Sequence, residues 1–478
     1  MTVLGVIAPM AVTVFTLPIY LRLIGEERYG ILALIWLVFG YFGLFDFGLS
    51  RATANHLARL RQAPAEEKAP VFFTALLMNA GLGLVGAVLL GVALTFASMM
   101  MSGADNGLRG ELQIGLPWLV LLLPLSTVSG VFVGCLEAEE RWGMINLQQV
   151  VGAVLQAVLP LVLVILLGAN LMFAIVGTVV GKALVIAWSA TAALRTFKGV
   201  KPKINPALLR PLLSYGGAVA LTNSISPILA SADRFVIASV SGLQAVTTYS
   251  VPFNIISKVT IVPAAVTRVL FPRFSSMAPT EAKALAERAL GVLGGVIAMI
   301  CCPIILLAHA GLSVWVGPDF AERGTTVTQV LAMGACFNAL AYVPFALLQG
   351  TGRPNLVARI HLFELLPFLL ILYVLVMFFG VEGAAWAWLM RVVADAVLLL
   401  HFTKLLRSSA RALLPCAGAI LVSFLTASLG TPLPYLVLLT VAISGAIIVW
   451  LYRTSPEWAR MARRVGSRLS PSKREFER

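Results

Sequence analysis

The side chains with the clearest chemical potential are basic residues inside long apolar stretches. They are Lys182, Arg234, Lys258, Arg268 and Arg391. Each costs about 2.5 to 3.5 kcal/mol at the centre of a membrane helix, so something must offset that cost. A water-filled cavity, an acidic partner or snorkelling toward the membrane surface can do so. A cavity lined by Lys and Arg would select anions, above all phosphate or an acidic sugar.

Lys182 and Arg391 are the leading cavity candidates, because both fall near the midpoint of an apolar stretch, where snorkelling is hardest. The alternative for Arg391 is an ion pair with Asp395, one helical turn further on. No acid is so placed for Lys182.

Lys258 and Arg268 share the apolar stretch from 246 to 272. Pro252 and Pro263 predict kinks in that helix, which would open hydrogen-bonding groups toward a lumen beside Lys258. Arg268 lies nearer one end and either lines the lumen or snorkels. The predicted cationic binding site therefore contains Lys182, Lys258, Arg268 and Arg391.

Acidic residues inside the apolar stretches are fewer, and they are candidates for gating or for ion coupling. Asp233 and Arg234 are neighbours that serve either as an interfacial anchor or as a gate contact. His361 and Glu364 share a helix face, and they form either a proton-responsive pair or a structural polar contact. The complete set of gate or coupling candidates is Asp46, Asp233, Arg234, His361, Glu364 and Asp395.

Several other chemistries are disfavoured. The nearest approach to a phosphate-cradling loop is GTVVGKA at 177–183, which has three residues between its glycines and ends in Ala. The five cysteines lie in apolar stretches without metal-ligand spacing, so they are predicted to be packing residues. We expect no catalytic residues, no metal site and no cofactor.

The elements that must position these residues are membrane helices. Of 478 residues, 59% are hydrophobic and 12% charged, whereas about a quarter of a soluble globular chain is charged. Residues 3–21 lack a basic leader and a cleavage site, so we expect a retained first helix. The prediction is an all-α polytopic membrane protein with about fourteen transmembrane helices, near 2–22, 29–49, 71–100, 115–137, 145–167, 170–194, 212–239, 246–272, 287–310, 325–349, 356–378, 381–403, 412–430 and 433–452.

The predicted helices fall into two blocks of six and a final pair. A single sequence offset pairs Gly143 with Gly352, and Lys182 with Arg391, which indicates a weak internal duplication. We predict pseudo-symmetric six-helix lobes at 1–200 and 201–409, a two-helix hairpin at 410–452 and a basic tail at 453–478. A cavity between such lobes is the expected substrate route.

The net charge of +14 follows the topology of a membrane protein rather than that of a nucleic-acid binder. Most of the 35 Lys and Arg residues lie in alternate loops and in the tail, which is the positive-inside pattern. Both termini are therefore predicted to be cytoplasmic, with the basic tail along anionic lipid headgroups.

Several strings, in order along nearly the whole chain, resemble the bacterial lipid-linked oligosaccharide flippases, also called O-antigen or exopolysaccharide transporters. That polysaccharide transporter family is part of the multidrug/oligosaccharidyl-lipid/polysaccharide exporter superfamily. The strings are LPIYLRLIGEERYGILALIW at 17–36, DFGLSRA at 46–52, GCLEAEERWGMIN at 134–146, ADRFVIA at 232–238, LFPRFSS at 270–276, LLQGTGRPN at 347–355 and GVEGAAWAW at 380–388.

The resemblance implies two lobes of the kind found in the multidrug exporters of this superfamily (MATE-like), around a cationic cavity. It implies alternating-access transfer of an undecaprenyl-diphosphate-linked oligosaccharide from the cytoplasmic to the periplasmic leaflet of the bacterial inner membrane. Expected partners are membrane lipid, that glycan and polysaccharide polymerase or assembly proteins, around a monomeric carrier. The final pair of spans exceeds the common twelve, as in the lipid II flippases. The four basic site residues are chosen by charge and depth, and not from a family motif.

Two alternatives stay open. A multidrug or cation antiporter of the same fold would need buried acids, and the first block offers Asp46 near its rim. A membrane-embedded sugar transferase or ligase would need a sizeable outer loop with clustered polar residues, whereas the outer loops here, such as 102–111 and 317–323, are small and sparse.

Overall fold

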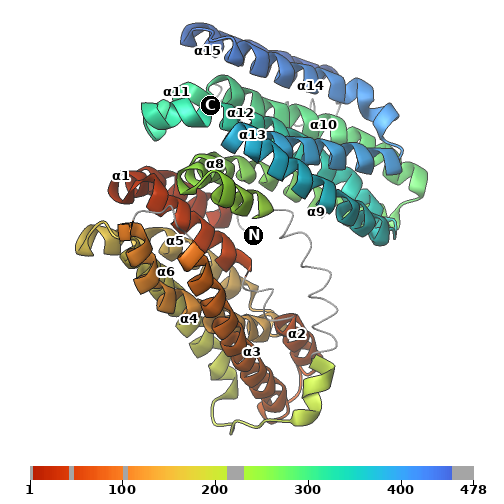
Figure 1. Ribbon diagram of the computed structural model, residues 1–478. Helices are drawn as coiled ribbons and strands as arrows, with labels where there is room; N and C mark the ends of the chain where they lie inside the picture. Colours follow the sequence, from red (N-terminus) through yellow and green to blue (C-terminus); the bar gives the residue numbers. More distant parts are fainter. Residues whose placement is uncertain (1–3, 42–47, 101–105, 213–230, 455–478) are drawn as a thin grey trace, which may run out of the picture. The chain divides into compact units, whose positions relative to one another are not determined.

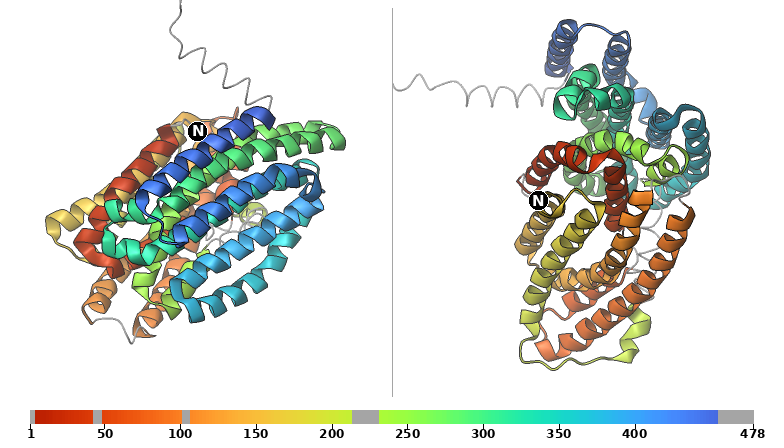
Figure 2. Two further views of the ribbon diagram at one scale, coloured as in Figure 1. Left: turned by 90° about the horizontal axis from the view of Figure 1, so that it is seen from above. Right: turned by 60° about the vertical axis from the view of Figure 1, so that its left-hand side comes forward.

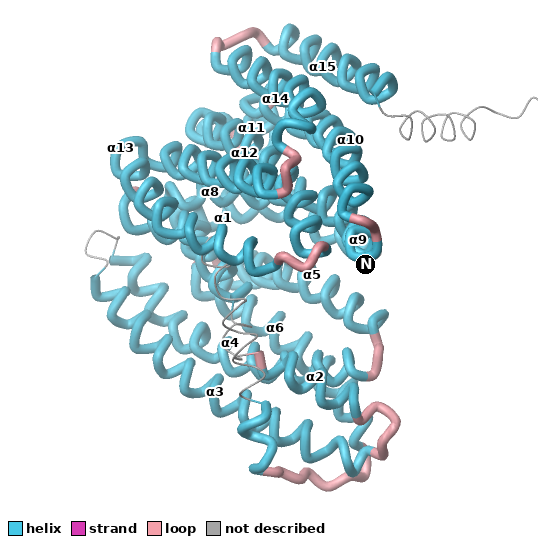
Figure 3. Tube along the Cα trace, turned by 90° about the vertical axis from the view of Figure 1, so that its right-hand side faces the viewer, coloured by secondary structure: helices cyan, strands magenta, loops and turns pink. Residues whose placement is uncertain are grey.

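The computed structural model describes residues 4–41, 48–100, 106–212 and 231–454 (Figure 1). Within these ranges the chain forms helices joined by short loops and contains no strand (Figure 3). Ten helical segments of these ranges are long and apolar enough to cross a membrane. The predicted all-α membrane fold is confirmed. The chain divides into two compact units, Met1–Phe235 and Val236–Arg478.

Two long helices each include residues of two predicted spans. They are α1, Leu4–Tyr41, and α13, Pro354–Phe402. A straight helix of the 49 residues in α13 would be more than twice as long as the apolar thickness of a bilayer, about 30 Å. Each helix instead bends at a glycine with positive φ, Gly25 at 80° and Gly380 at 58°, a conformation that glycine adopts without strain. The paired spans are thus joined by a bend and not by a loop.

Unit 1 is a bundle of packed helices, and its helix bounds largely follow the predicted spans. α4 packs against α3 and α6, and α5 packs against α1 and α6 (Figure 1). The predicted linker from 50 to 70 also contains a short helix, α2, whose buried residues pack against α4. After α1 the helices of this unit are α2 Leu49–Arg59, α3 Ala65–Met100, α4 Asn106–Ala138, α5 Trp142–Leu167 and α6 Leu171–Leu194.

α5 and α6 approach closely at Gly177. A Cβ atom built on Gly177 would lie 2.8 Å from the Pro160 backbone nitrogen and 3.1 Å from the Leu159 carbonyl carbon. Backbone atoms cannot rotate away as a side-chain tip can. The small residue therefore sets the distance between these two helices, as small residues commonly do in membrane bundles.

We expect Gly177→Ala to destabilise the protein by about 1 to 3 kcal/mol, because the added methyl group must push the two backbones apart. The thermal unfolding midpoint of purified protein in detergent measures this loss. Gly81→Ala is the matched control, since a Cβ at Gly81 meets nothing within 4 Å and alanine favours a helix more than glycine does. Equal midpoints for the two variants would contradict the close approach.

Unit 2 is organised around α12, Pro318–Gly350, which packs against α8, α9, α10, α11 and α13. The predicted final pair of spans forms α14 and α15, and both pack on α10. They are the last two helices along the colour bar of Figure 2. Leu451 of α15 covers Gly295 of α10. The remaining bounds are α8 Leu243–Ile256, α9 Ile261–Ser276, α10 Pro279–Leu306, α11 Ala308–Trp315, α14 Leu406–Ser428 and α15 Leu433–Thr454.

The span predicted at 212–239 falls mainly on residues outside the described ranges, and residues 231–240 at its end are helical. The lobe boundary predicted after residue 200 stays a prediction.

Candidate functional site

Unit 1 contains a cavity of about 570 Å³ that is lined by one face from each of α1, α4, α5 and α6. The α6 face recurs every three or four residues, at Thr178, at Gly181 with Lys182, at Val185 and at Ser189, as expected for one side of a helix. Glycines and alanines stand on the neighbouring helices, so the space is left open by small side chains. The cavity is large enough for a sugar unit.

Lys182 is the cation of this cavity. Protein surrounds it, yet its side chain is accessible because it projects into the cavity. Among the described residues it has no hydrogen-bond or ion-pair partner. An ammonium group so placed is available to an anionic ligand. This is the environment predicted for Lys182 from its depth in the apolar stretch, although the binding role itself stays a prediction.

Three glutamines of α5 also line the cavity, Gln148, Gln149 and Gln156. Gln149 and Gln156 are exposed to it, whereas Gln148 is 4% exposed. Neither the Oε1 nor the Nε2 atom of Gln148 has a hydrogen-bond partner among the described residues. The cavity therefore offers neutral donors and acceptors beside one positive charge.

An aromatic cluster fixes the α1 side of the cavity. The Trp36 indole nitrogen donates to the Thr178 hydroxyl at 3.2 Å. Tyr20 meets Trp36 edge to face with ring centroids 5.7 Å apart, and its hydroxyl donates to the Ala157 carbonyl oxygen at 2.8 Å. These contacts hold the indole in one orientation at the cavity wall.

Unit 2 gathers a polar cluster on the two arms of α13, on either side of the bend at Gly380. His361 Nε2 of the first arm lies 3.5 Å from Asp395 Oδ1 of the second. Glu364 is 6% exposed, and neither of its carboxylate oxygens has a hydrogen-bond partner among the described residues. His361 also stacks against Phe345 of α12. The candidates His361, Glu364, Arg391 and Asp395 are thus neighbours within one unit.

Arg391 has different surroundings from Lys182, although the internal duplication predicts equivalent positions for the two residues. Its guanidinium carbon lies 5.4 Å from the centre of the Phe368 ring, a cation–π contact. The alternative prediction for Arg391, an ion pair with Asp395, is wrong: within the described residues Asp395 is paired with His361. The bend at Gly380 brings His361 across from the other arm, and the sequence spacing of the second arm alone does not reveal this.

Lys258 and Arg268 have exposed side chains in unit 2. Lys258 lies in a 3₁₀ turn, η4, Ser257–Thr260, which separates α8 from α9 between Pro252 and Pro263. The 3₁₀ turn interrupts the predicted helix beside Lys258, and the kinks at Pro252 and Pro263 themselves stay a prediction. Arg268 lies on α9 and is exposed as well. Both positions leave the cations accessible, and their part in binding stays a prediction.

Asp233 and Arg234 are both buried, and the Arg234 Nη1 atom lies 3.8 Å from Asp233 Oδ1. The Arg234 backbone N–H also donates to the same carboxylate oxygen at 2.8 Å. Whether this pair acts as an interfacial anchor or as a gate contact stays a prediction. Asp46 lies outside the described residues.

Arg28 and Glu111, which the sequence places in loops between predicted spans, form an ion pair at one end of unit 1. We call this ion pair, with its bond to Leu171, the clasp. Glu111 of α4 accepts two hydrogen bonds from Arg28, at 2.8 and 2.6 Å, and a third from the Leu171 backbone N–H at 3.0 Å. Arg28 follows the bend at Gly25, and Leu171 begins α6. One carboxylate thereby ties the bend of α1 to the starts of α4 and α6.

Removing this carboxylate should loosen all three helices. We expect Glu111→Ala to lower the free energy of unfolding by about 1 to 3 kcal/mol, because a charged donor and a backbone N–H lose their acceptor. The thermal unfolding midpoint in detergent checks this. The midpoint of Glu111→Gln should lie between those of wild type and Glu111→Ala. The control is Glu322→Ala, whose side chain is exposed; a loss of the same size in the control would contradict the clasp.

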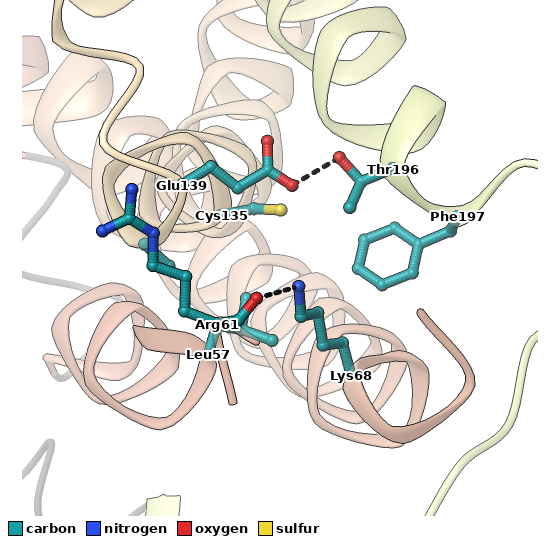
Figure 4. Close-up of a pocket in the computed structure, with 8 residues that line it drawn as sticks. Leu57, Arg61, Lys68, Cys135, Glu139, Thr196 and Phe197 are labelled. Atoms are coloured by element: carbon teal, nitrogen blue, oxygen red, sulfur yellow. Dashed lines mark hydrogen bonds between the residues drawn. The ribbon is translucent and has the colours of Figure 1, made fainter. Parts of the chain in front are cut away.

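A smaller pocket of about 270 Å³ lies where α2, α3 and α4 meet the turn Arg195–Phe197 (Figure 4). Its polar groups bind one another. Glu139 accepts a hydrogen bond from Thr196 at 2.7 Å, and Lys68 donates to the Arg61 carbonyl oxygen at 2.8 Å. We therefore interpret this pocket as a tie between loops of unit 1 and not as a ligand site.

The charged members of these sites are predicted from the sequence, and the neutral ones are not. Gln148, Gln149, Gln156 and Trp36 carry no charge, so a search for charges in apolar stretches passes over them. The available signal was the recurrence of Gln along one face of the span at 145–167, at 149 and 156.

Comparisons with known proteins agree with these features. The profile of the family described as "Polysaccharide biosynthesis protein" matches residues 1–278. The "Putative O-antigen transporter" of Shigella flexneri is 29% identical over 405 residues, which cover 83% of this chain and 94% of that protein.

Solved structures share the fold at low identity. "Lipid II flippase MurJ, inward closed conformation" has a TM-score of 0.72 at 13% identity and covers 95% of this chain and 99% of its own. An inward-facing multidrug resistance MATE family transporter of the MOP superfamily has a TM-score of 0.68 at 16% identity, with 85% and 99% covered. The resemblance stated from the sequence is confirmed. The chain belongs to the polysaccharide biosynthesis protein family of membrane transporters and has the fold of MATE and MurJ.

Proposed function

We propose that this protein is a flippase that moves an undecaprenyl-diphosphate-linked oligosaccharide, the repeat unit of a polysaccharide, by alternating access. Transfer runs from the cytoplasmic to the periplasmic leaflet of a bacterial inner membrane, with both termini in the cytoplasm. The lipid-linked glycan, membrane lipid and polysaccharide polymerase or assembly proteins are its proposed partners, and the carrier is proposed to act as a monomer.

The observation that carries this proposal is Lys182 in the cavity of unit 1. A lysine at mid-span is costly unless water or an anion accompanies it. Lys182 has no partner within the described residues, and the cavity around it is of ligand size and carries further polar side chains among apolar ones. A diphosphate or an acidic sugar supplies the missing negative charge. Lys258, Arg268 and Arg391 are proposed as further cations along the route.

The cluster on α13 is the proposed coupling site. Two carboxylates, one histidine and one guanidinium lie together on the two arms of α13. Ionisable groups inside membrane spans commonly serve ion or proton relays. Binding or release of a cation by Glu364 and Asp395 would change the net charge of the cluster. Such a change can bias a carrier between its two states only if the cation binds them with different affinity.

Depletion of the protein in its own cells tests the proposal. We expect oligosaccharide-diphosphate lipid to accumulate where an externally added glycosidase cannot reach it in spheroplasts. Re-expression of the wild type should restore access. Unchanged accessibility after depletion would contradict a flippase role.

A cation antiporter of the same fold is a second candidate, and Glu364 is the observation that favours it. A buried carboxylate without a hydrogen-bond partner within the described residues can attract an organic cation. Efflux of a fluorescent organic cation from proteoliposomes under a pH gradient separates the candidates. The flippase proposal expects no efflux above that of protein-free vesicles.

A further inference from the structure

The cavity of unit 1 is richer in neutral hydrogen-bonding groups than an anion site requires. Apart from Lys182 it presents three carboxamides of α5 and several Ser and Thr hydroxyls. A phosphate group has acceptor oxygens and needs only donors. The acceptor oxygens of the carboxamides therefore imply a second kind of ligand group.

Gln148 is the most informative of these side chains. It is 4% exposed and lines the cavity, yet both ends of its carboxamide lack a partner among the described residues. A buried donor or acceptor that makes no hydrogen bond costs about 1 to 3 kcal/mol of folding free energy for each group. Buried polar groups of native proteins are mostly satisfied, so an unsatisfied carboxamide in a residue that lines a cavity is a candidate for completion by a ligand.

The ligand group must both donate to Oε1 and accept from Nε2. A phosphate only accepts, an ammonium group only donates, and a polyprenyl chain does neither. A sugar hydroxyl pair or an acetamido group does both, with the bidentate geometry that a planar carboxamide offers. Trp36 supplies an aromatic wall whose orientation is fixed by Thr178.

We propose that Gln148 is a specificity-determining residue that reads a hydroxyl or acetamido group of the transported sugar, apart from the anion that Lys182 binds. This inference rests on the proposed flippase function and names which chemical part of the lipid-linked glycan each side chain recognises. Gln149, the next residue, and Gln156, about two turns further along α5, also line the cavity and add further carboxamide contacts to the sugar.

Binding to wild type in lipid nanodiscs tests the proposal with two kinds of probe. One is undecaprenyl diphosphate without sugar, and the other is a set of undecaprenyl diphosphates bearing glucose, galactose or N-acetylglucosamine. Wild type should bind at least one sugar-bearing probe about tenfold more tightly than the bare diphosphate. Gln148→Leu should lose that preference, keep the affinity for the bare diphosphate, and unfold at an equal or higher temperature, because it removes unsatisfied polar atoms.

The outcomes separate this inference from the flippase proposal. A wild type that binds no probe at all overturns the proposed function. Equal binding of all probes by wild type, or a preference retained by Gln148→Leu, overturns the sugar-reading role and leaves the anion site standing. A lower unfolding midpoint for ligand-free Gln148→Leu would show that Gln148 stabilises the fold, and this result would overturn the inference as well.

Discussion

Lys182→Ala should lower the initial rate of lipid-linked oligosaccharide transfer by roughly 10- to 100-fold. A hydrogen bond to a charged group contributes about 1.5 to 3 kcal/mol, and each 1.4 kcal/mol is a factor of ten. We expect the whole of this contribution to be lost, because Lys182 is the charged residue among those that line the cavity of unit 1, and no second cation among the described lining residues can replace it. The rate is measured in proteoliposomes as the fraction of labelled lipid that becomes reactive to an external enzyme.

Two variants make this result specific. Lys182→Arg keeps the charge and should retain a substantial part of the rate. Lys203→Ala removes an exposed lysine of the linker and should transport as wild type does. The thermal midpoint of Lys182→Ala should stay near that of wild type, since no partner within the described residues depends on this ammonium group. Full transport by Lys182→Ala would refute the proposed anion site.

Glu364→Leu should have opposite effects on stability and on transport. Its carboxylate is buried without a hydrogen-bond partner in the described part of the chain, so an apolar residue of similar volume should stabilise the protein by about 1 to 3 kcal/mol. The same change should remove the acceleration of transport by an imposed ion gradient, because Glu364 belongs to the proposed coupling cluster. Thermal unfolding and flux with and without a pH gradient measure the two effects.

Glu382→Leu is the matched control, on the same helix α13 but with an exposed side chain. Glu382→Leu should leave the unfolding midpoint near that of wild type, and an imposed ion gradient should still accelerate transport. A lower midpoint for Glu364→Leu would reveal a structural partner for the carboxylate. An unaltered gradient response would place the coupling site elsewhere.

The expected positions of the helices follow from the sequence, because long apolar stretches in lipid can only be helices. The pairing of spans into α1 and α13 does not follow as directly. Gly25 and Gly380 each stand between two predicted spans, and a glycine there is compatible with either a loop or a bend. The bend requires the positive φ that the structure reveals.

The candidate site was predictable in its charges and not in its neutral groups. Lys182 stands out because a lone ammonium group in an apolar span needs a cavity or a partner. The pairing of Asp395 with His361 depends on the fold of α13 across Gly380, which joins residues far apart in the chain. Gln148 looks like an ordinary polar residue near a helix start, and only its burial without a partner singles it out.

The central claim is that this carrier moves diphosphate-linked glycan between leaflets, and one measurement tests it most directly. Purified wild type is reconstituted into liposomes that contain labelled undecaprenyl-diphosphate-linked oligosaccharide, and a membrane-impermeant glycosidase is added outside. With active carrier, the cleaved fraction should rise from the outer-leaflet share of about half toward completion, within minutes, while protein-free liposomes stay at that share. Identical cleavage with and without the protein would contradict the account.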